Sequence, residues 1–302
     1  MSDPQLNAPT GTGTVRQSLI GAVAFPGDAF CEAFSATATP REHWQSLLAA
    51  LDATGFDVLR KRQERVRSMR HEDGATYNLF DDATSRGTSW ALDMIPLPMA
   101  AGEWEALEAG LIQRAQLLER ILADVYGPQE LLKTGRIPPE LLFANPNFLR
   151  SCHGIHPSGN RYLTYYAADL YRAPDGRFRV FRDYGDNPAG IGYALENRIV
   201  LSRVFSRLYH GTQVRRLAPF FNTFYHSLLQ RASLRLEDPG IVLLSPGPES
   251  QVYFEQALLS RYLGLPLVEG QDLTVRNGEV FLKKLAGLEP VAAIWRHVDD
   301  AG

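Results

Sequence analysis

Lysine, cysteine and long apolar runs are scarce in this sequence of 302 residues. Of its 31 basic residues only four are lysines, at positions 61, 133, 283 and 284. Two cysteines make no disulfide framework, which indicates a reducing compartment. No segment reaches the roughly 18 apolar residues of a membrane span, and the N-terminus lacks a basic region followed by an apolar core. By default, these absences predict a cytoplasmic protein.

Composition and charge are those of a globular protein with a sizeable core. Apolar residues make up 45% and charged residues 22% of the chain, and its net charge of −3 disfavours a general nucleic-acid or membrane-surface binder. The order of patterns predicts a mixed α/β fold in three regions. These are a mobile tail (1–35), a helical and β-hairpin region (36–238), and a Rossmann-like βαβ segment (239–302), in which an apolar run at 241–244 precedes a helix and a strand.

Helical periodicity is strongest between residues 102 and 126. Apolar side chains recur there at steps of three and four, which predicts a continuous buried stripe made of Trp104, Leu107, Leu111, Ala115, Leu118, Leu122 and Val125. A second helix, at 57–70, is rich in arginine. Its basic run is interpreted either as a solvated face or as a source of arginines that hold an anionic substrate group.

A hairpin is predicted around Pro174-Asp175-Gly176, with Asp169 at the end of its first apolar run and Asp183 at the end of its second. With these three residues in the loop, Ala173 faces Arg177, and counting outward places Asp169 opposite Phe181. Side chains alternate faces along a strand, so both acids are expected on one face as diagonal neighbours, roughly 7–8 Å apart. Such a pair suits a divalent cation, whereas the alternative is a surface hairpin with solvated acids.

Several segments together resemble the circularly permuted type 2 ATP-grasp proteins, a group described as glutathionylspermidine-synthase-like. The resemblance runs from about residue 44 to the end of the chain, and its most specific segment is Gly192–Arg198. The other matching segments are Leu122–Gly127, Pro139–Leu141, Asp169, Pro174–Gly176, Asp183, Pro188–Gly190, Pro246–Pro248, Tyr253–Glu255, Val268–Leu273, Arg296 and Asp299–Asp300.

The resemblance implies an ATP-dependent carboxylate–amine ligase that forms a peptide-like bond through an acyl phosphate, with ATP and magnesium and a small carboxylate or peptide substrate. It implies metal ligation by Asp169, Asp183 and either Asp186 or Asn187, and nucleotide contacts from Asn187, Gly190 and Asn197. Arg198 and Arg296 are the expected catalytic residues, with Arg198 as a clamp for phosphate or carboxylate. The alternative for Arg198 is a structural ion pair with Glu196 or another acid.

Two departures from the family pattern qualify these expectations. After Asp183, the family usually has a basic residue, a small polar residue and glutamine, whereas this chain has Tyr184-Gly185-Asp186-Asn187. Family members also continue beyond the point where this chain ends, into a glycine-rich flap with ATP-binding lysines, so a truncated member is expected. The alternative functions are a non-catalytic binding or scaffold protein that keeps the fold without the nucleotide lid, and a metal-dependent hydrolase, for which the sequence offers no base.

Overall fold

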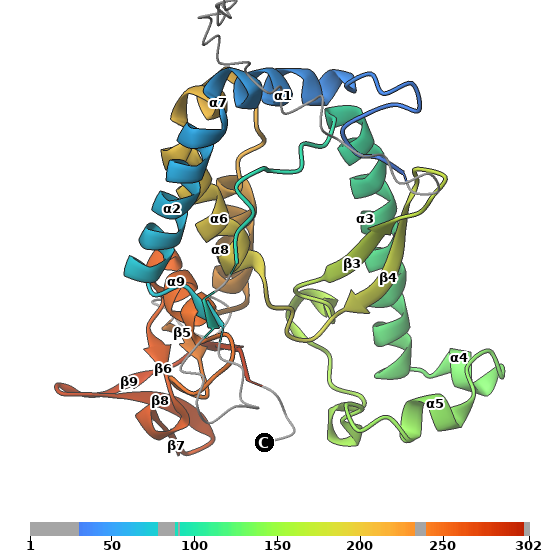
Figure 1. Ribbon diagram of the computed structural model, residues 1–302. Helices are drawn as coiled ribbons and strands as arrows, with labels where there is room; N and C mark the ends of the chain where they lie inside the picture. Colours follow the sequence, from blue (N-terminus) through green and yellow to red (C-terminus); the bar gives the residue numbers. More distant parts are fainter. Residues whose placement is uncertain (1–29, 78–87, 90, 233–239, 299–302) are drawn as a thin grey trace, which may run out of the picture.

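The computed structural model describes residues 30–77, 88–89, 91–232 and 240–298 (Figure 1). The fold is mixed α/β, as predicted. The helices are α1 (Glu42–Thr54), α2 (Phe56–Glu72), α3 (Ala101–Val125), α4 (Glu130–Lys133), α5 (Pro139–Phe143), α6 (Ile191–Val204), α7 (Ser206–Gly211), α8 (Ala218–Ala232) and α9 (Tyr253–Leu263), with 3₁₀ turns η2 (Arg150–Cys152), η3 (Ser158–Asn160) and η4 (Gly270–Asp272). The strands are β1 (Thr76–Tyr77), β2 (Thr88–Ser89), β3 (Ala167–Arg172), β4 (Phe178–Tyr184), β5 (Ile241–Leu244), β6 (Leu267–Val268), β7 (Leu273–Arg276), β8 (Glu279–Lys284), β9 (Gly287–Pro290) and β10 (Ala293–Arg296).

Helices α1 and α2 meet at a sharp corner and pack against α6 and α7 (Figure 1). Gly55 ends α1 with a φ of 77°, a backbone conformation that favours glycine, and α2 begins at the next residue. The buried side chains at this junction are Trp44, Leu47, Leu51, Leu59, Met94 and Phe205. This cluster holds the junction of α6 and α7 against α1 and α2, while the start of α6 lies near the parallel sheet.

The parallel sheet has the strand order β10-β5-β6. Its central strand β5 is almost entirely buried, as its unbroken apolar run predicts, because helices α8 and α9 pack against the sheet. The predicted βαβ unit is therefore present as β5, α9 and β6, and β10 adds to the other side of β5. All three strands run in the same direction, so their carboxyl ends lie along one edge.

A second, antiparallel sheet follows in the order β7-β8-β9. The dipeptide Asn277-Gly278 is a typical two-residue hairpin turn, and it joins β7 to β8. Both residues have positive φ, as the commonest turn of this kind requires. Leu282 packs with Val242 and Val268 of the parallel sheet. The two sheets of this region thus share one small core.

Helix α3 and the β3–β4 hairpin lie side by side on the other side of the molecule from the parallel sheet (Figure 1). The predicted buried stripe along α3 is wrong, because only Val125 is buried on this helix in the described structure. A two-stranded hairpin is too narrow to bury seven apolar positions, and the other six residues of the stripe are only partly buried. No helix in the described parts of the chain is long and apolar enough to cross a membrane.

Other boundaries moved by a few residues. The apolar pattern at 195–209 also predicts one helix, but the observed helix starts earlier and is divided by Phe205 into α6 and α7. The sequence at 75–80 and 89–94 predicts two strands. The structure shows β1 and β2 there, while residues 78–87 and 90 lie outside the described part and 91–94 are not strand. Most of the predicted tail also lies outside it, although Phe34 is buried.

Arg172 connects three segments that are far apart in the sequence. Its guanidinium forms ion pairs with Glu32 of the N-terminal segment and Glu103 of α3, and it donates a hydrogen bond to the Gly176 carbonyl in the hairpin loop. It also stacks over Phe178, with its central carbon 3.9 Å from the ring centroid. Because only 10% of this side chain is exposed, the two carboxylates depend on it for their charge balance.

We expect Arg172→Met to lower the free energy of unfolding by about 2 kcal/mol, because methionine fills the space but leaves two partly buried carboxylates unpaired. Urea denaturation followed by tryptophan fluorescence measures the change. Arg179→Met is the matched control, since Arg179 lies on the same hairpin and pairs with the exposed Asp175. Equal losses in the two variants would contradict the connecting role of Arg172.

Candidate functional site at the hairpin, helix α6 and the carboxyl edge of the sheet

The predicted hairpin loop is present, but the predicted register holds only close to the loop. The Ala173 amide donates to the Arg177 carbonyl, and Leu170 faces Val180 as expected. The register then shifts, so that Asp169 faces Arg182 and Ala168 faces Asp183. Phe181 is the extra residue of a β-bulge and is 78% exposed. This one-residue shift puts Asp169 and Asp183 on opposite faces of the hairpin.

Each of the two carboxylates has its own partners on its own face. Asp183 lies on the face toward α3, where Arg114 donates to both carboxylate oxygens at 2.6 Å and the Tyr166 hydroxyl donates at 2.7 Å. The hydrogen bonds from Arg114 hold the pKa of Asp183 below its usual range. Asp169, on the other face, accepts a hydrogen bond of 2.7 Å from the Tyr184 hydroxyl.

The expectation that these acids share a magnesium ion is therefore wrong for this arrangement. Asp186 is exposed in the loop that leads to α6. Within the described residues, no group of three or more acid, histidine or cysteine side chains is placed to hold a metal ion. A metal role for any one of these carboxylates alone stays a prediction.

Helix α6 begins at a buried carboxylate that comes from α9. Glu255 is fully buried, and its oxygens accept hydrogen bonds from the Gly190 amide at 2.8 and 2.9 Å and from the Gly192 amide at 2.7 Å. These amides are among the donors that a helix start leaves unpaired, and a negative charge there is also favoured by the helix dipole. Burial raises the pKa of Glu255, although the two backbone donors oppose this shift.

The family resemblance implies a nucleotide contact for Gly190, and it includes Glu255 only as part of the segment Tyr253–Glu255. In the structure the Gly190 amide is already bonded to Glu255, and Gly190 adopts a φ of 117° that favours glycine. Gly192 has a different constraint, because a β-carbon on it would lie 2.6 Å from Cγ of Glu255. Gly192 therefore permits the close approach of α9 to α6, whereas Gly190 permits the backbone conformation at the start of α6.

The remaining predicted residues of α6 have different surroundings. Arg198 lies over the ring of Tyr209 and donates to its hydroxyl at 3.3 Å. Among the described residues it forms no ion pair with Glu196 or another acid, which was the alternative expected for it. Glu196 is buried toward α2 with Arg70, and burial together with the nearby Asp73 raises its pKa. The side-chain oxygen of Asn197 is inaccessible to solvent and has no hydrogen-bond partner among the described residues.

A buried polar chain of three residues lies at the carboxyl edge of the parallel sheet. Ser245 follows β5, His297 follows β10, and Gln256 of α9 joins them. Gln256 Nε2 donates to the His297 carbonyl at 2.9 Å and lies 3.0 Å from His297 Nδ1, while the Ser245 hydroxyl donates to Gln256 Oε1 at 2.5 Å. Because the His297 carbonyl can only accept a hydrogen bond, the Gln256 atom that faces it must be the amide nitrogen. The same nitrogen also faces His297 Nδ1, which accepts its second hydrogen when Nδ1 is the unprotonated ring nitrogen.

This edge contains the predicted Arg296. Arg296 is the last residue of β10 and is exposed, and the Glu269 carboxylate after β6 lies beside Gly247. From the sequence, the turn after Leu244 and the cluster from Arg296 to Asp300 are expected to line the substrate side of a site, and these two segments contain Ser245 and His297. Gln256 of α9 is not singled out by the sequence. Ser245 and His297 directly follow strands of the parallel sheet, where ligands of such sheets bind. Asp299 and Asp300 lie outside the described residues.

We expect Gly192→Ala to lower the free energy of unfolding by about 1–3 kcal/mol, because the added methyl group must displace the buried Glu255 side chain. The matched control is Gly110→Ala in α3, where nothing lies within 4 Å of an added β-carbon. Alanine there raises stability by up to about 1 kcal/mol through helix propensity. Urea denaturation measures both changes, and stabilisation by both substitutions would contradict the contact.

Glu255 also predicts a pH dependence of stability. Its pKa is raised above the ordinary value of 4.5, so the folded state binds more protons than the unfolded state above pH 4.5. The contribution of Glu255 is therefore lost as the pH rises through its folded-state pKa, with a slope of at most about 1.4 kcal/mol per pH unit. Urea denaturation of the wild type and Glu255→Gln between pH 4 and 8 isolates this group. If the difference in free energy of unfolding between the wild type and Glu255→Gln stayed constant or changed in favour of the wild type above pH 4.5, the raised pKa of Glu255 would be contradicted.

Comparison with known proteins supports the resemblance found in the sequence. The family "Circularly permuted ATP-grasp type 2" matches residues 96–302. A protein of Mycobacterium tuberculosis, named only as uncharacterized, is 37% identical over 296 residues, covering 95% of this chain and 34% of its own length. One from Synechocystis is 31% identical over 275 residues, covering 91% and 57%. The chain thus spans about a third of the mycobacterial relative.

A solved structure shares the fold. It is the apo form of a glutathione synthetase-like effector from Globodera pallida, which superposes with a TM-score of 0.51 at 15% sequence identity. The match covers 81% of this chain and 58% of the effector. At this identity the likeness establishes the ATP-grasp type of fold alone. With the family match over most of the chain, it leads to one conclusion: the protein belongs to the circularly permuted ATP-grasp type 2 family.

Proposed function

We propose that this chain forms part of an ATP-dependent ligase that joins a carboxylate to an amine. The observation that carries the proposal is the family match over residues 96–302, because this range contains all eight predicted site residues. ATP would supply the phosphoryl group that activates the carboxylate. Proteins catalyse such transfers mainly by positioning the reactants and neutralising charge.

Two of the predicted residues are suited to these tasks by their surroundings. Arg296 stands at the carboxyl edge of the parallel sheet, where a guanidinium can hold a carboxylate or phosphate with two parallel hydrogen bonds. Asn197 has a buried amide oxygen that no described residue bonds, and buried acceptors in folded proteins are usually bonded. We assign Arg296 to the substrate and Asn197 to a hydrogen bond with the nucleotide.

Other predicted residues have roles that this arrangement changes. Asp169 and Asp183 lie on opposite faces of the hairpin, so they do not fit a shared magnesium ion, and no catalytic step is assigned to that pair. Gly190 is bonded to Glu255 and positions α6 rather than a phosphate. Asn187 and Asp186 lie in the loop before α6, and we retain them as ligands of the nucleotide or of its metal ion. Arg198 is retained as a second clamp, held at present by Tyr209.

A second function, a non-catalytic binding or scaffold role, is favoured by one specific observation. Asp183 is engaged by Arg114 and Tyr166 in a way that joins the hairpin to α3. Because three donors already bond this carboxylate, its role in this arrangement is to hold the hairpin against α3. Under this alternative, the chain keeps the fold and binds a nucleotide or a carboxylate without turning it over.

Calorimetric titration with ATP in the presence of magnesium tests nucleotide binding directly. We expect the wild type to bind, and Asn197→Leu to weaken binding about tenfold through loss of one buried hydrogen bond. Asp175→Asn is the control, because Asp175 is an exposed acid of the hairpin loop that pairs with Arg179. Catalysis is then measured as ATP-dependent formation of hydroxamate from a pool of amino acids and short peptides with hydroxylamine.

The outcomes separate the two functions. Hydroxamate formation that Arg296→Gln reduces supports the ligase. ATP binding that Asn197→Leu weakens, with no hydroxamate formed, supports the binding role instead. Failure of the wild type to bind ATP with or without magnesium would contradict both nucleotide assignments.

A further inference from the structure

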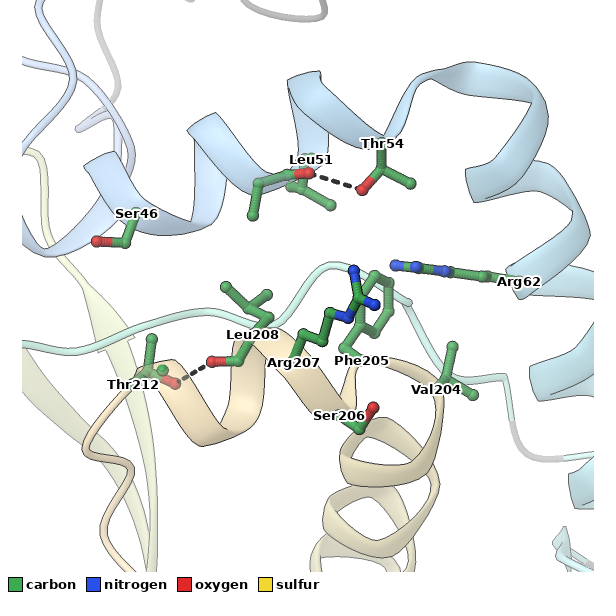
Figure 2. Close-up of a pocket in the computed structure, with 12 residues that line it drawn as sticks. Ser46, Leu51, Thr54, Arg62, Val204, Phe205, Ser206, Arg207, Leu208 and Thr212 are labelled. Carbon is green, nitrogen blue, oxygen red and sulfur yellow. Dashed lines mark hydrogen bonds between the residues drawn. The ribbon is translucent and has the colours of Figure 1, made fainter.

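A pocket of about 500 Å³ lies between α1 and the junction of α6 and α7 (Figure 2). Its walls come from Ser46 to Thr54 of α1, from Arg62 of α2, and from the segment Val204–Thr212. None of the eight predicted site residues lines it. The volume falls within the range of small-molecule sites in proteins.

Two arginines from different helices line this pocket, Arg62 from α2 and Arg207 from α7. Figure 2 shows their guanidinium groups directed toward the same region beside Phe205. Arg62 is positioned by stacking, with its central guanidinium carbon 5.0 Å from the centroid of the Phe205 ring. Within the described structure, neither arginine forms an ion pair, and none of the lining residues is acidic.

The other polar groups of the lining do not replace these donors. The Thr54 hydroxyl donates to the Ala50 carbonyl at 2.7 Å, and the Thr212 hydroxyl donates to the Leu208 carbonyl at 2.9 Å. Both hydroxyl protons are therefore directed into their own helices. The two guanidinium groups are the strong donors of the lining, and like charges that converge in this way are stabilised by an anion placed between them.

The rest of the lining is apolar. Leu51 and Phe205 are buried core residues that reach the pocket floor, and Val204 and Leu208 add aliphatic surface. An inorganic ion would leave these walls without a partner, whereas a ligand with an apolar body and one oxyanion group would use both parts of the site.

We propose that this pocket binds a small organic anion, whose phosphate or carboxylate group is held by Arg62 and Arg207 while its apolar part lies against Phe205. This site is separate from the proposed ligase residues and does not depend on ATP. It also gives a role to one arginine of the basic run on α2, for which both a solvated face and anion binding were considered.

Calorimetric titration at low ionic strength with phenyl phosphate, benzoate and benzyl alcohol tests the proposal. These probes share an aromatic ring and differ in the group that the arginines would meet. We expect a Kd below about 1 mM for at least one of the two anions and no measurable binding of the neutral alcohol. Tighter binding of phenyl phosphate or of benzoate identifies the oxyanion as phosphate or carboxylate. Equal binding of the alcohol, or no binding of either anion, would overturn the proposal.

Variants locate the site. Arg207→Gln is expected to weaken binding of the anion about tenfold, the equivalent of one charge-assisted hydrogen bond. Arg207 is exposed, so this variant is expected to fold normally, whereas Arg62→Gln also removes the stacking on Phe205 and requires a check of its melting temperature. Arg60→Gln is the matched control, because Arg60 lies on α2, outside the lining, and pairs with Asp57. A loss in Arg60→Gln equal to that in Arg207→Gln would show a general charge effect and overturn the site.

Discussion

The arrangement of this protein depends on one buried carboxylate. Glu255 comes from the helix that covers the parallel sheet, and it bonds the amides at the start of α6. A fully buried acid is costly unless donors surround it, and here the donors are backbone groups that themselves need partners. The amides at the start of α6 therefore stabilise the buried carboxylate, and the carboxylate gives these amides hydrogen-bond acceptors. Because α6 also packs on α2 and follows the hairpin, this contact sets how the sheet, the helical corner and the hairpin segment meet.

Around that contact, polar groups are buried in matched sets. Ser245, Gln256 and His297 satisfy one another at the edge of the parallel sheet, and Arg172 satisfies two carboxylates near the hairpin. The Asn197 amide oxygen is one of several buried polar atoms without a hydrogen-bond partner among the described residues, together with atoms of Trp44, Arg70, Trp104 and Glu196. Asn197 differs from most of these residues in lying within the family segment Gly192–Arg198, and a ligand contact at its oxygen is physically reasonable for that reason. The two proposals concern separate parts of the molecule, because the anion pocket lies at the outer end of α6 and α7.

Much of the fold was predictable from local patterns. The period of α3, the arginine-rich pattern of α2, the apolar run of β5 and the turn residues of the β3–β4 hairpin predicted their elements within a few residues. The family was also predictable, because its motifs occur in order along the chain. The burial of α3 and the site geometry were not. An apolar stripe predicts a face that can be buried, but the width of the partner decides how much of it is covered.

Local sequence by itself determined which segments are helix or strand, where the hairpin turns, and to which family the chain belongs. Tertiary structure decided which face each acid of the hairpin occupies. The loop residues predict the pairing correctly as far as Leu170, but the bulge at Phe181 reverses the alternation beyond it. On the shifted face, Asp183 bonds Arg114 of α3, a contact between residues that are 69 positions apart in the sequence. No count of residues along one strand contains that information, because the period of two assumes that the strand is unbroken.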